Sequence, residues 1–278
     1  MTTRTPTGRR RRLGAELRRL REEAGLTIDR VAEALECSQS KVSRIETGQV
    51  SATPRDVRDM LALYRVDDDR REAMVQVARE ARQPGWWQKF VDVPDGVPAY
   101  VGLEAAATSI DVYMSLIVPA LLQTPDYARA VIGAVRPDLP AAEIDRRVEL
   151  RIRRQGLLDQ DHPPAMRVLL DDTVLRRPVG GAAVMAAQRR RLLADAERPA
   201  VTLQVLEVAA GAHAGMDGPF TIFGFPAPAE RDVVALDSAA DALYLENPED
   251  LRRYRRVFDL LLPAALTPEA SAALIAPG

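Results

Sequence analysis

Apolar residues near the start of the chain recur every three or four positions, which is the spacing of amphipathic helices. Three such stripes follow one another. The first ends at Gly25, the second begins after Thr27, and the third begins after Ser38 and ends at Gly48. Their apolar members are Leu13, Leu17, Leu20 and Ala24, then Ile28, Val31, Ala32 and Leu35, then Val42 and Ile45. Two short helices joined by a tight break at residues 36–37 describe a helix-turn-helix, although other small α-bundles share this periodicity.

Two further helices are expected after Gly48. Thr53 is a good N-cap, Pro54 suits the first helical position, and Asp56 places an acid in the first turn. A fifth helix is expected to open at residues 67–69. The pattern therefore predicts an all-α helix-turn-helix domain of five helices over residues 1–83.

Helix and strand patterns alternate in the rest of the chain. Residues 84–100 carry both tryptophans and several prolines, and they predict a linker. Its tryptophans either seal a domain interface, the commoner arrangement, or form a ligand platform. Residues 101–278 predict an α/β (α+β) domain with a mixed or antiparallel sheet. Its expected strands are residues 112–118, 166–170, 201–208, 220–225 and 233–236. Two of its expected helices start at Pro125 and Pro248, and two others include residues 144–152 and 184–193.

The outward face of the third helix indicates what the first domain binds. The side chains that point away from its apolar stripe are Gln39, Ser40, Lys41, Ser43 and Arg44. Glutamine can bridge adenine edges, arginine can fork onto guanine, and lysine and serine suit phosphates. A merely solvated helix usually mixes glutamate with lysine, whereas this face has no acid before Glu46. The face therefore predicts binding to double-stranded DNA.

The stretch LTIDRVAEALECSQSKVSRIETG, residues 26–48, resembles the XRE-type (lambda-repressor-like) helix-turn-helix regulators, above all in its core SQSKVSRIETG. The resemblance implies that Gln39, Ser40 and Arg44 read bases. It also implies backbone or mixed contacts from Lys41 and Ser43, a phosphate anchor at Thr27, and a structural role for Glu46.

One residue of the turn departs from this family. Glu36 stands where glycine is frequent. A glutamate in the left-handed conformation is strained by roughly 1 kcal/mol, so the sequence leaves open whether the turn keeps its usual shape.

Four more residues are candidate phosphate contacts: Arg9, Arg10, Thr53 and Arg55. The arginines at positions 9–12 either form an arm that reaches a minor groove or begin the first helix and attract phosphates without specificity. Thr53 and Arg55 follow the third helix, where such domains often touch a second run of phosphates, and simple capping and solvation explain them equally well.

The C-terminal part carries a second resemblance, in the segments GWWQKF, YVGLEAAATSI, VPALLQTPDYARAVI, RIRRQGLL, GAHAGMDGPFTIFGF and LTPEAS. They are similar to actinobacterial XRE-type, WhiJ-like regulators, whose C-terminal domain has no assigned biochemistry. Some members are antitoxin-like and pair with a small protein encoded beside them. Ala120 and Asp111 depart from the usual pattern, which has a glycine and often a basic residue there.

The distribution of charge supports a two-part molecule. Residues 1–66 hold 14 basic and 9 acidic residues, a net charge of +5, so the remainder carries −7 against −2 overall. A basic head on an acidic body suits a DNA-binding module joined to a part that does not touch DNA. The single cysteine, Cys37, allows no internal disulfide, and neither a signal peptide nor a long apolar run is visible, so we expect a cytoplasmic protein without a membrane span.

Residues suited to catalysis or metal binding are scarce. The chain has two histidines, His162 and His213, and no zinc-binding, nucleophile-elbow or phosphate-loop motif. Asp171 and Asp172 are adjacent, so on a strand they would face opposite ways, and a cap or turn is the simpler interpretation. We expect no enzyme, no cofactor and no metal. A site pairing His213 with a carboxylate and a hydroxyl would instead favour an enzyme with a DNA-targeting head.

These features together predict a sequence-specific DNA-binding transcriptional regulator that acts as a homodimer. Its C-terminal domain is expected to support dimerisation. It is also expected to bind either a small acidic protein partner encoded nearby or a small-molecule effector.

Overall fold

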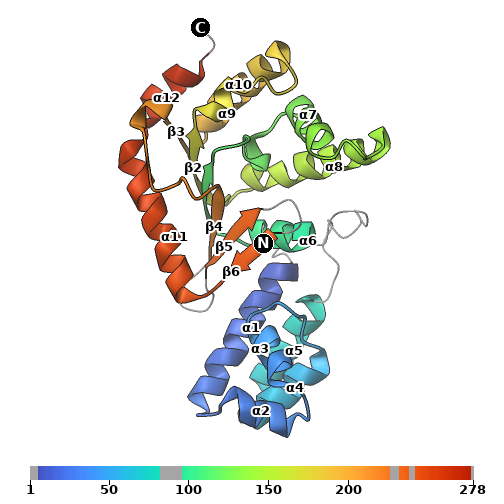
Figure 1. Ribbon diagram of the computed structural model, residues 1–278. Helices are drawn as coiled ribbons and strands as arrows, with labels where there is room; N and C mark the ends of the chain where they lie inside the picture. The colour runs from blue at the N-terminus through green and yellow to red at the C-terminus, as the bar shows by residue number, and fades with distance from the viewer. Residues whose placement is uncertain (1–5, 82–95, 226–231, 238–241, 277–278) are drawn as a thin grey trace. The chain divides into compact units, whose positions relative to one another are not determined.

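The computed structural model describes residues 6–81, 96–225, 232–237 and 242–276, and the chain divides into two compact units (Figure 1). The first is built on the helices α1 to α5 and the second on a β-sheet flanked by helices. Within the described ranges no single helix is long and apolar enough to cross a membrane. One bent pair, Pro248–Ala264 with Pro268–Ile275, passes that test by length and composition alone.

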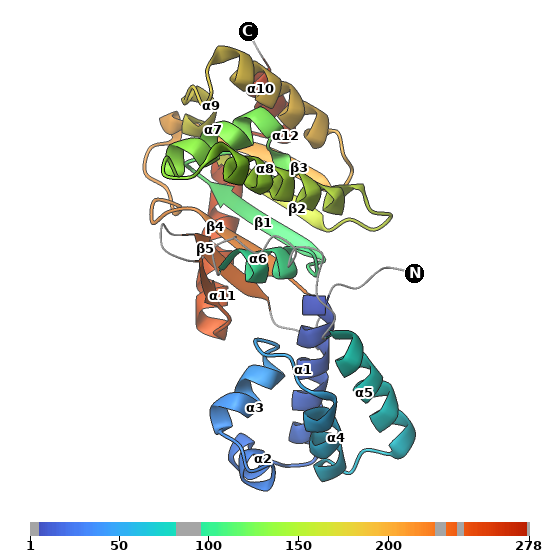
Figure 2. The same cartoon turned by 90° about the vertical axis from the view of Figure 1, so that its right-hand side faces the viewer.

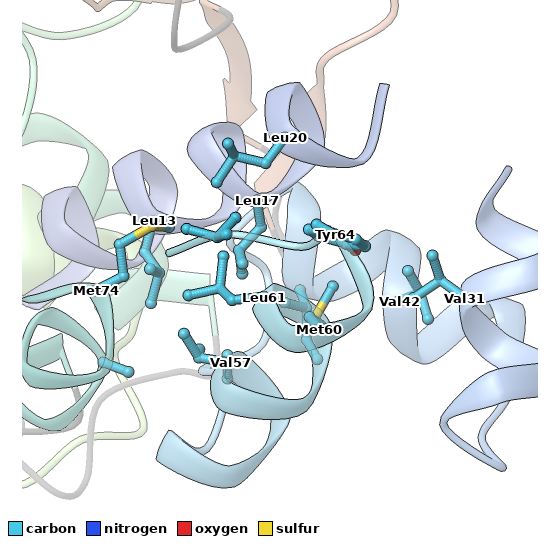
Figure 3. Close-up of a cluster of buried hydrophobic side chains, with 14 of the residues drawn as sticks. Leu13, Leu17, Leu20, Val31, Val42, Val57, Met60, Leu61, Tyr64 and Met74 are labelled. Carbon is cyan, nitrogen blue, oxygen red and sulfur yellow. The ribbon is translucent and has the colours of Figure 1, made fainter. Parts of the chain in front are cut away.

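The N-terminal unit contains the five expected helices: α1 (Pro6–Glu23), α2 (Ile28–Ala34), α3 (Gln39–Glu46), α4 (Pro54–Leu63) and α5 (Asp68–Ala81). Their apolar stripes meet in one core, in which Leu17, Leu61 and Met60 are fully buried (Figure 3). Ala24 is an exception, since it lies beyond the end of α1 and is exposed.

Hydrogen bonds at the helix starts explain why these residues form these helices. Thr27, Ser38 and Thr53 each accept a backbone hydrogen bond three residues ahead, from Arg30, Lys41 and Asp56 respectively. Asp56 returns the contact by accepting from the Thr53 backbone N–H, so α4 begins with a complete capping box. Gly25 and Gly48 have φ angles of +68° and +71°, which favour glycine after a helix.

The second unit contains a six-stranded sheet in the order β3-β2-β1-β4-β5-β6. The strands are β1 (Ser109–Met114), β2 (Ala165–Asp171), β3 (Val201–Leu206), β4 (Phe220–Gly224), β5 (Val233–Asp237) and β6 (Ala242–Leu245). β1, β2 and β3 are parallel, and β4, β5 and β6 add antiparallel partners. The expected α/β architecture with a mixed sheet is confirmed.

Helices cover both faces of this sheet (Figures 1 and 2). α11 (Pro248–Leu261) lies along one face, where Phe258 and Leu261 pack with Tyr113, Leu169 and other residues of the sheet. The opposite face is covered by α7 (Pro125–Val135), α8 (Ala141–Gln155) and α10 (Ala182–Ala196). The edge of β3 is closed by the segment before α12 (Pro268–Ile275), because Leu266 N–H donates to the Val205 carbonyl.

Several expected boundaries are wrong. The strand expected over residues 112–118 ends at Met114, and Leu116 beyond it is 55% exposed. The strand expected over residues 201–208 ends at Leu206. The helices α6 (Gly96–Glu104), α9 (Thr173–Arg176) and α12, and the strand β6, were not expected. Residues 84–95 of the expected linker, with Trp86 and Trp87, lie outside the described residues, whereas residues 96–100 begin α6.

Both departures from the C-terminal family pattern have a structural setting. Asp111 is buried and accepts two hydrogen bonds of 2.7 Å from Arg167, its direct partner across the β1–β2 pair. Arg167 also lies over the ring of Phe258. Ala120 begins a single 3₁₀ turn (Ala120–Leu122) and does not have a positive φ, so this position does not require glycine.

Candidate nucleic-acid interface

The turn between α2 and α3 keeps a left-handed residue even though that residue is a glutamate. Glu36 has a φ of +50°. Its N–H donates to the Glu33 carbonyl, and the N–H of Cys37 donates to that of Ala32. The turn therefore accepts the strain of a side chain at this position.

Replacing Glu36 by glycine is expected to raise the free energy of unfolding by up to about 1 kcal/mol, because glycine adopts this φ without steric cost. Glu33→Gly is the matched control, since Glu33 is exposed within α2, where glycine costs about 1 kcal/mol. Hydrogen exchange of peptides from α2 and α3 measures the change in the free energy of unfolding in both variants. Equal losses of stability in the two variants would contradict the assigned strain.

The outward face of α3 is exposed as the sequence predicts. Gln39, Ser40 and Arg44 are exposed, whereas Val42 and Ile45 of the same helix are buried. The Arg44 guanidinium contacts the protein only through a long hydrogen bond of 3.4 Å to the Ser40 carbonyl among the contacts described. Gln39 and Ser40 begin α3 and Arg44 lies in its last turn, and all three are on the exposed side of the helix. An exposed polar face on one helix is the arrangement that reads base edges in a major groove.

Lys41 has a different environment from its neighbours on α3. Its Nζ lies 2.7 Å from Asp56 Oδ1, on the first turn of α4, and its side chain is 42% exposed. The hydrogen bond that Lys41 donates to the Asp56 carboxylate raises the pKa of Lys41. Burial opposes ionisation of Asp56, but hydrogen bonds from Lys41 and Thr53 outweigh it and lower its pKa. The pair links α3 to α4 and holds the Lys41 ammonium group beside Asp56.

The other predicted contacts fall into two groups. Thr27 and Arg55 are exposed, whereas Ser43 and Thr53 are half-buried. Thr53 is engaged with Asp56 through both its backbone and its hydroxyl, so its capping role is established.

The basic run at residues 9–12 lies inside α1, which favours its interpretation as the start of a helix over that of an extended arm. The side chain of Arg9 lies outside the described residues. Arg10 is half-buried, and burial lowers its pKa.

A buried ion pair supports α3 from behind. Arg21 of α1 donates from Nε and Nη2 to the two carboxylate oxygens of Glu46, at 2.7 and 2.9 Å, and from Nη1 to the Leu26 carbonyl. Both charged side chains are buried. The structural role that the family resemblance implies for Glu46 is confirmed. Arg21 was not predicted, because nothing in its local pattern distinguishes it from the other arginines of α1.

The second unit brings His213 near a carboxylate and a hydroxyl, but not in a catalytic order. His213 Nε2 lies 4.0 Å from Asp171 Oδ2, whereas the Thr173 hydroxyl donates to Oδ1 of the same carboxylate at 2.5 Å. A nucleophile needs its hydroxyl on the histidine, and here the carboxylate stands between the two. Asp171 also accepts from Thr173 N–H at the start of α9, so the cap interpretation is confirmed for this residue. Asp172 makes no cap hydrogen bond with its side chain and accepts instead from Arg176.

No group of three or more His, Cys, Asp or Glu side chains suited to a metal ion occurs in the part of the chain that the structure describes.

Comparison with known families agrees with this division of the chain. Residues 12–74 match a helix-turn-helix domain, which covers most of α1, all of α2 to α4 and part of α5. Residues 97–277 match the family described as a domain of unknown function (DUF5753). The chain belongs to this family and carries a helix-turn-helix domain before it. No curated protein and no solved structure matches the chain.

Proposed function

We propose that this protein is a sequence-specific transcriptional regulator of XRE type that binds double-stranded DNA as a homodimer in the cytoplasm. The observation that carries the proposal is the exposed polar face of α3, opposite its buried apolar face. On this basis Gln39, Ser40 and Arg44 read base edges. Ser43, Thr27 and Arg55, with Arg9 and Arg10 at the start of α1, approach phosphates.

The ion pair between Lys41 and Asp56 refines the part that Lys41 plays. Its ammonium group is held beside the Asp56 carboxylate of α4, so the pair has no net charge and Lys41 can contact a phosphate only through the N–H donors that Asp56 leaves free. Thr53 acts mainly through the cap of the same helix.

The C-terminal domain controls DNA binding in this proposal and has no catalytic role, cofactor or metal. It supports dimerisation and binds either a small acidic protein, as in WhiJ-like and antitoxin-like regulators, or a small-molecule effector. Specific association with the product of a neighbouring gene for a small acidic protein would support the first of these branches.

The test is footprinting on the DNA upstream of the protein's own gene, with wild type and Arg44→Ala. Arg44→Ala is expected to lower the affinity for the specific site about tenfold and to relax the sequence preference of the protein, because a forked contact to guanine contributes about 1–3 kcal/mol of discrimination. Arg79→Ala is the matched control, since it removes the same charge from the exposed side of α5.

Two outcomes would overturn the proposal. Unchanged affinity and preference in Arg44→Ala would exclude the assigned base contact. Failure of wild type to protect any discrete site at low salt would exclude the regulator itself.

A further inference from the structure

The topology of the second unit brings three strand ends and one loop to a single edge of the sheet. β1, β2 and β3 are parallel, so their carboxyl ends share that edge. The chain leaves β3 at one side and re-enters at β4, which pairs with β1. The connecting residues 207–219 must therefore pass the ends of β2 and β1. In open α/β sheets, ligands bind outside the carboxyl ends of the parallel strands, which is the edge that this loop crosses.

Contacts of the loop fix the orientation of His213 at this edge. His213 Nδ1 accepts a hydrogen bond of 3.2 Å from the Gly215 N–H, so a neutral imidazole carries its proton on Nε2. The ring meets that of Tyr113 edge-on, with centroids 6.0 Å apart. Gly215 is buried against Tyr113 so closely that a Cβ would lie 2.6 Å from the ring. The loop is thus packed onto the end of β1.

Asp171, the last residue of β2, is oriented from the other side. Its Oδ1 accepts from both the N–H and the hydroxyl of Thr173, which leaves Oδ2 facing His213 Nε2. The side chains of His213 and Asp171 are 14% and 13% exposed, so the two groups are mostly shielded and still reachable. Burial and the negative charge of Asp171 raise the pKa of Tyr113 to about 12, so its phenol stays neutral beside the pair.

The separation of 4.0 Å between His213 Nε2 and Asp171 Oδ2 exceeds a hydrogen bond. An oxygen about 2.8 Å from both atoms would make an angle of about 90° between them. A hydroxyl in that position accepts from Nε2–H and donates to the carboxylate. A carboxylate or phosphate lacks the donor and is repelled by Asp171, and an ammonium group lacks the acceptor.

Three large apolar side chains are exposed on the segments that follow β1 and β3 at this edge. Leu116, after β1, and Val208 and Met216, in the loop after β3, are 55%, 54% and 71% exposed. Large apolar side chains exposed beside a few oriented polar groups are typical of sites for small molecules with an apolar body.

We propose that the carboxyl edge of β1–β3 binds a small molecule that has a hydroxyl group on an apolar body. His213 and Asp171 hold the hydroxyl, and Leu116, Val208 and Met216 contact the apolar part. This site would hold the small-molecule effector of the proposed function, and its role in regulation rests on that proposed function.

The two histidines make the site measurable in the full-length chain. Imidazole proton signals are recorded by NMR during titration with cyclohexanol, and His162, which is exposed, provides the internal reference. Cyclohexanol is expected to shift the His213 signals to a plateau at millimolar concentration without shifting those of His162, whereas cyclohexylamine and cyclohexanecarboxylate are not. Absence of a saturable shift, or an equal response to the three compounds, would overturn the proposal.

Variants separate binding from folding. Asp171→Ala is expected to lower the affinity for cyclohexanol about tenfold, because it removes a charged hydrogen-bond partner. Asp161→Ala, next to His162 on an exposed loop, is expected to bind like wild type. If Asp171→Ala does not fold, His213→Phe keeps the ring against Tyr113, and calorimetric titration should show the same loss. Wild-type affinity in the folded variant would contradict the site. The titrations contain no DNA, so their outcome does not depend on the outcome of the footprinting experiment.

Discussion

Replacing Glu46 by alanine is expected to lower the free energy of unfolding of the helix-turn-helix domain by about 3–5 kcal/mol. The change leaves the Arg21 guanidinium buried, with two of its hydrogen bonds lost. The guanidinium keeps only the Leu26 carbonyl and the exposed Glu22 carboxylate, which lies 3.6 Å from Nη2, so most of the compensation for its lost hydration is removed. Hydrogen exchange of peptides from α1 and α3 in the full-length chain measures the loss for this domain separately.

Two further variants distinguish the buried pair from ordinary surface charges. Glu33→Ala removes the partner of Arg30 in a pair whose side chains are 73% and 71% exposed, and it is expected to change stability by less than about 1 kcal/mol. Arg21→Met combined with Glu46→Leu removes both charges and should restore much of the stability lost in Glu46→Ala. A loss below about 1 kcal/mol in Glu46→Ala would show that the pair does not hold α1 against α3.

The sequence could predict the helices of the first domain because their starts and ends are encoded locally. Thr27, Ser38 and Thr53 cap the helices that follow them, and apolar spacing identifies the buried faces. Partners far apart in the chain carry no such signal. Arg21 and Glu46 are 25 residues apart, and Lys41 and Asp56 are 15 apart. The polar face of α3 was therefore predictable, but the contacts that orient it were not.

The sheet shows that local sequence patterns do not predict where a strand ends. The apolar alternation from Val112 to Val118 continues past the strand, but β1 stops at Met114, opposite Leu170 of β2. The length of a strand depends on its neighbours, which the pattern does not contain. α12 did have a local signal, because Thr267 caps it and Pro268 occupies its first turn, as Thr53 and Pro54 do in α4.

Gly14 offers a test in which local preference and tertiary structure predict opposite signs. It lies inside α1, where alanine is more favourable than glycine by about 1 kcal/mol on helix propensity alone. In the structure, however, a Cβ at this position would lie 2.4 Å from the Ile45 carbonyl oxygen and 2.7 Å from that of Glu46. Both are backbone atoms at the end of α3, so relief requires the helices to separate. Gly14→Ala is therefore expected to cost about 2 kcal/mol, within the usual range for overpacking.

Gly133→Ala provides the matched control for this expectation. Gly133 is also helical, in α7, and the nearest atom to a Cβ there is Ile144 Cδ1 at 3.8 Å, an ordinary contact. It should gain up to about 1 kcal/mol, since only helix propensity acts. Hydrogen exchange of the peptides around each glycine measures the two changes in their own domains. Because α3 carries Arg44, the loss in Gly14→Ala should extend to DNA affinity, whereas Gly133→Ala should leave that affinity unchanged. A gain of stability in both variants would mean that α1 and α3 do not approach as closely as the structure shows.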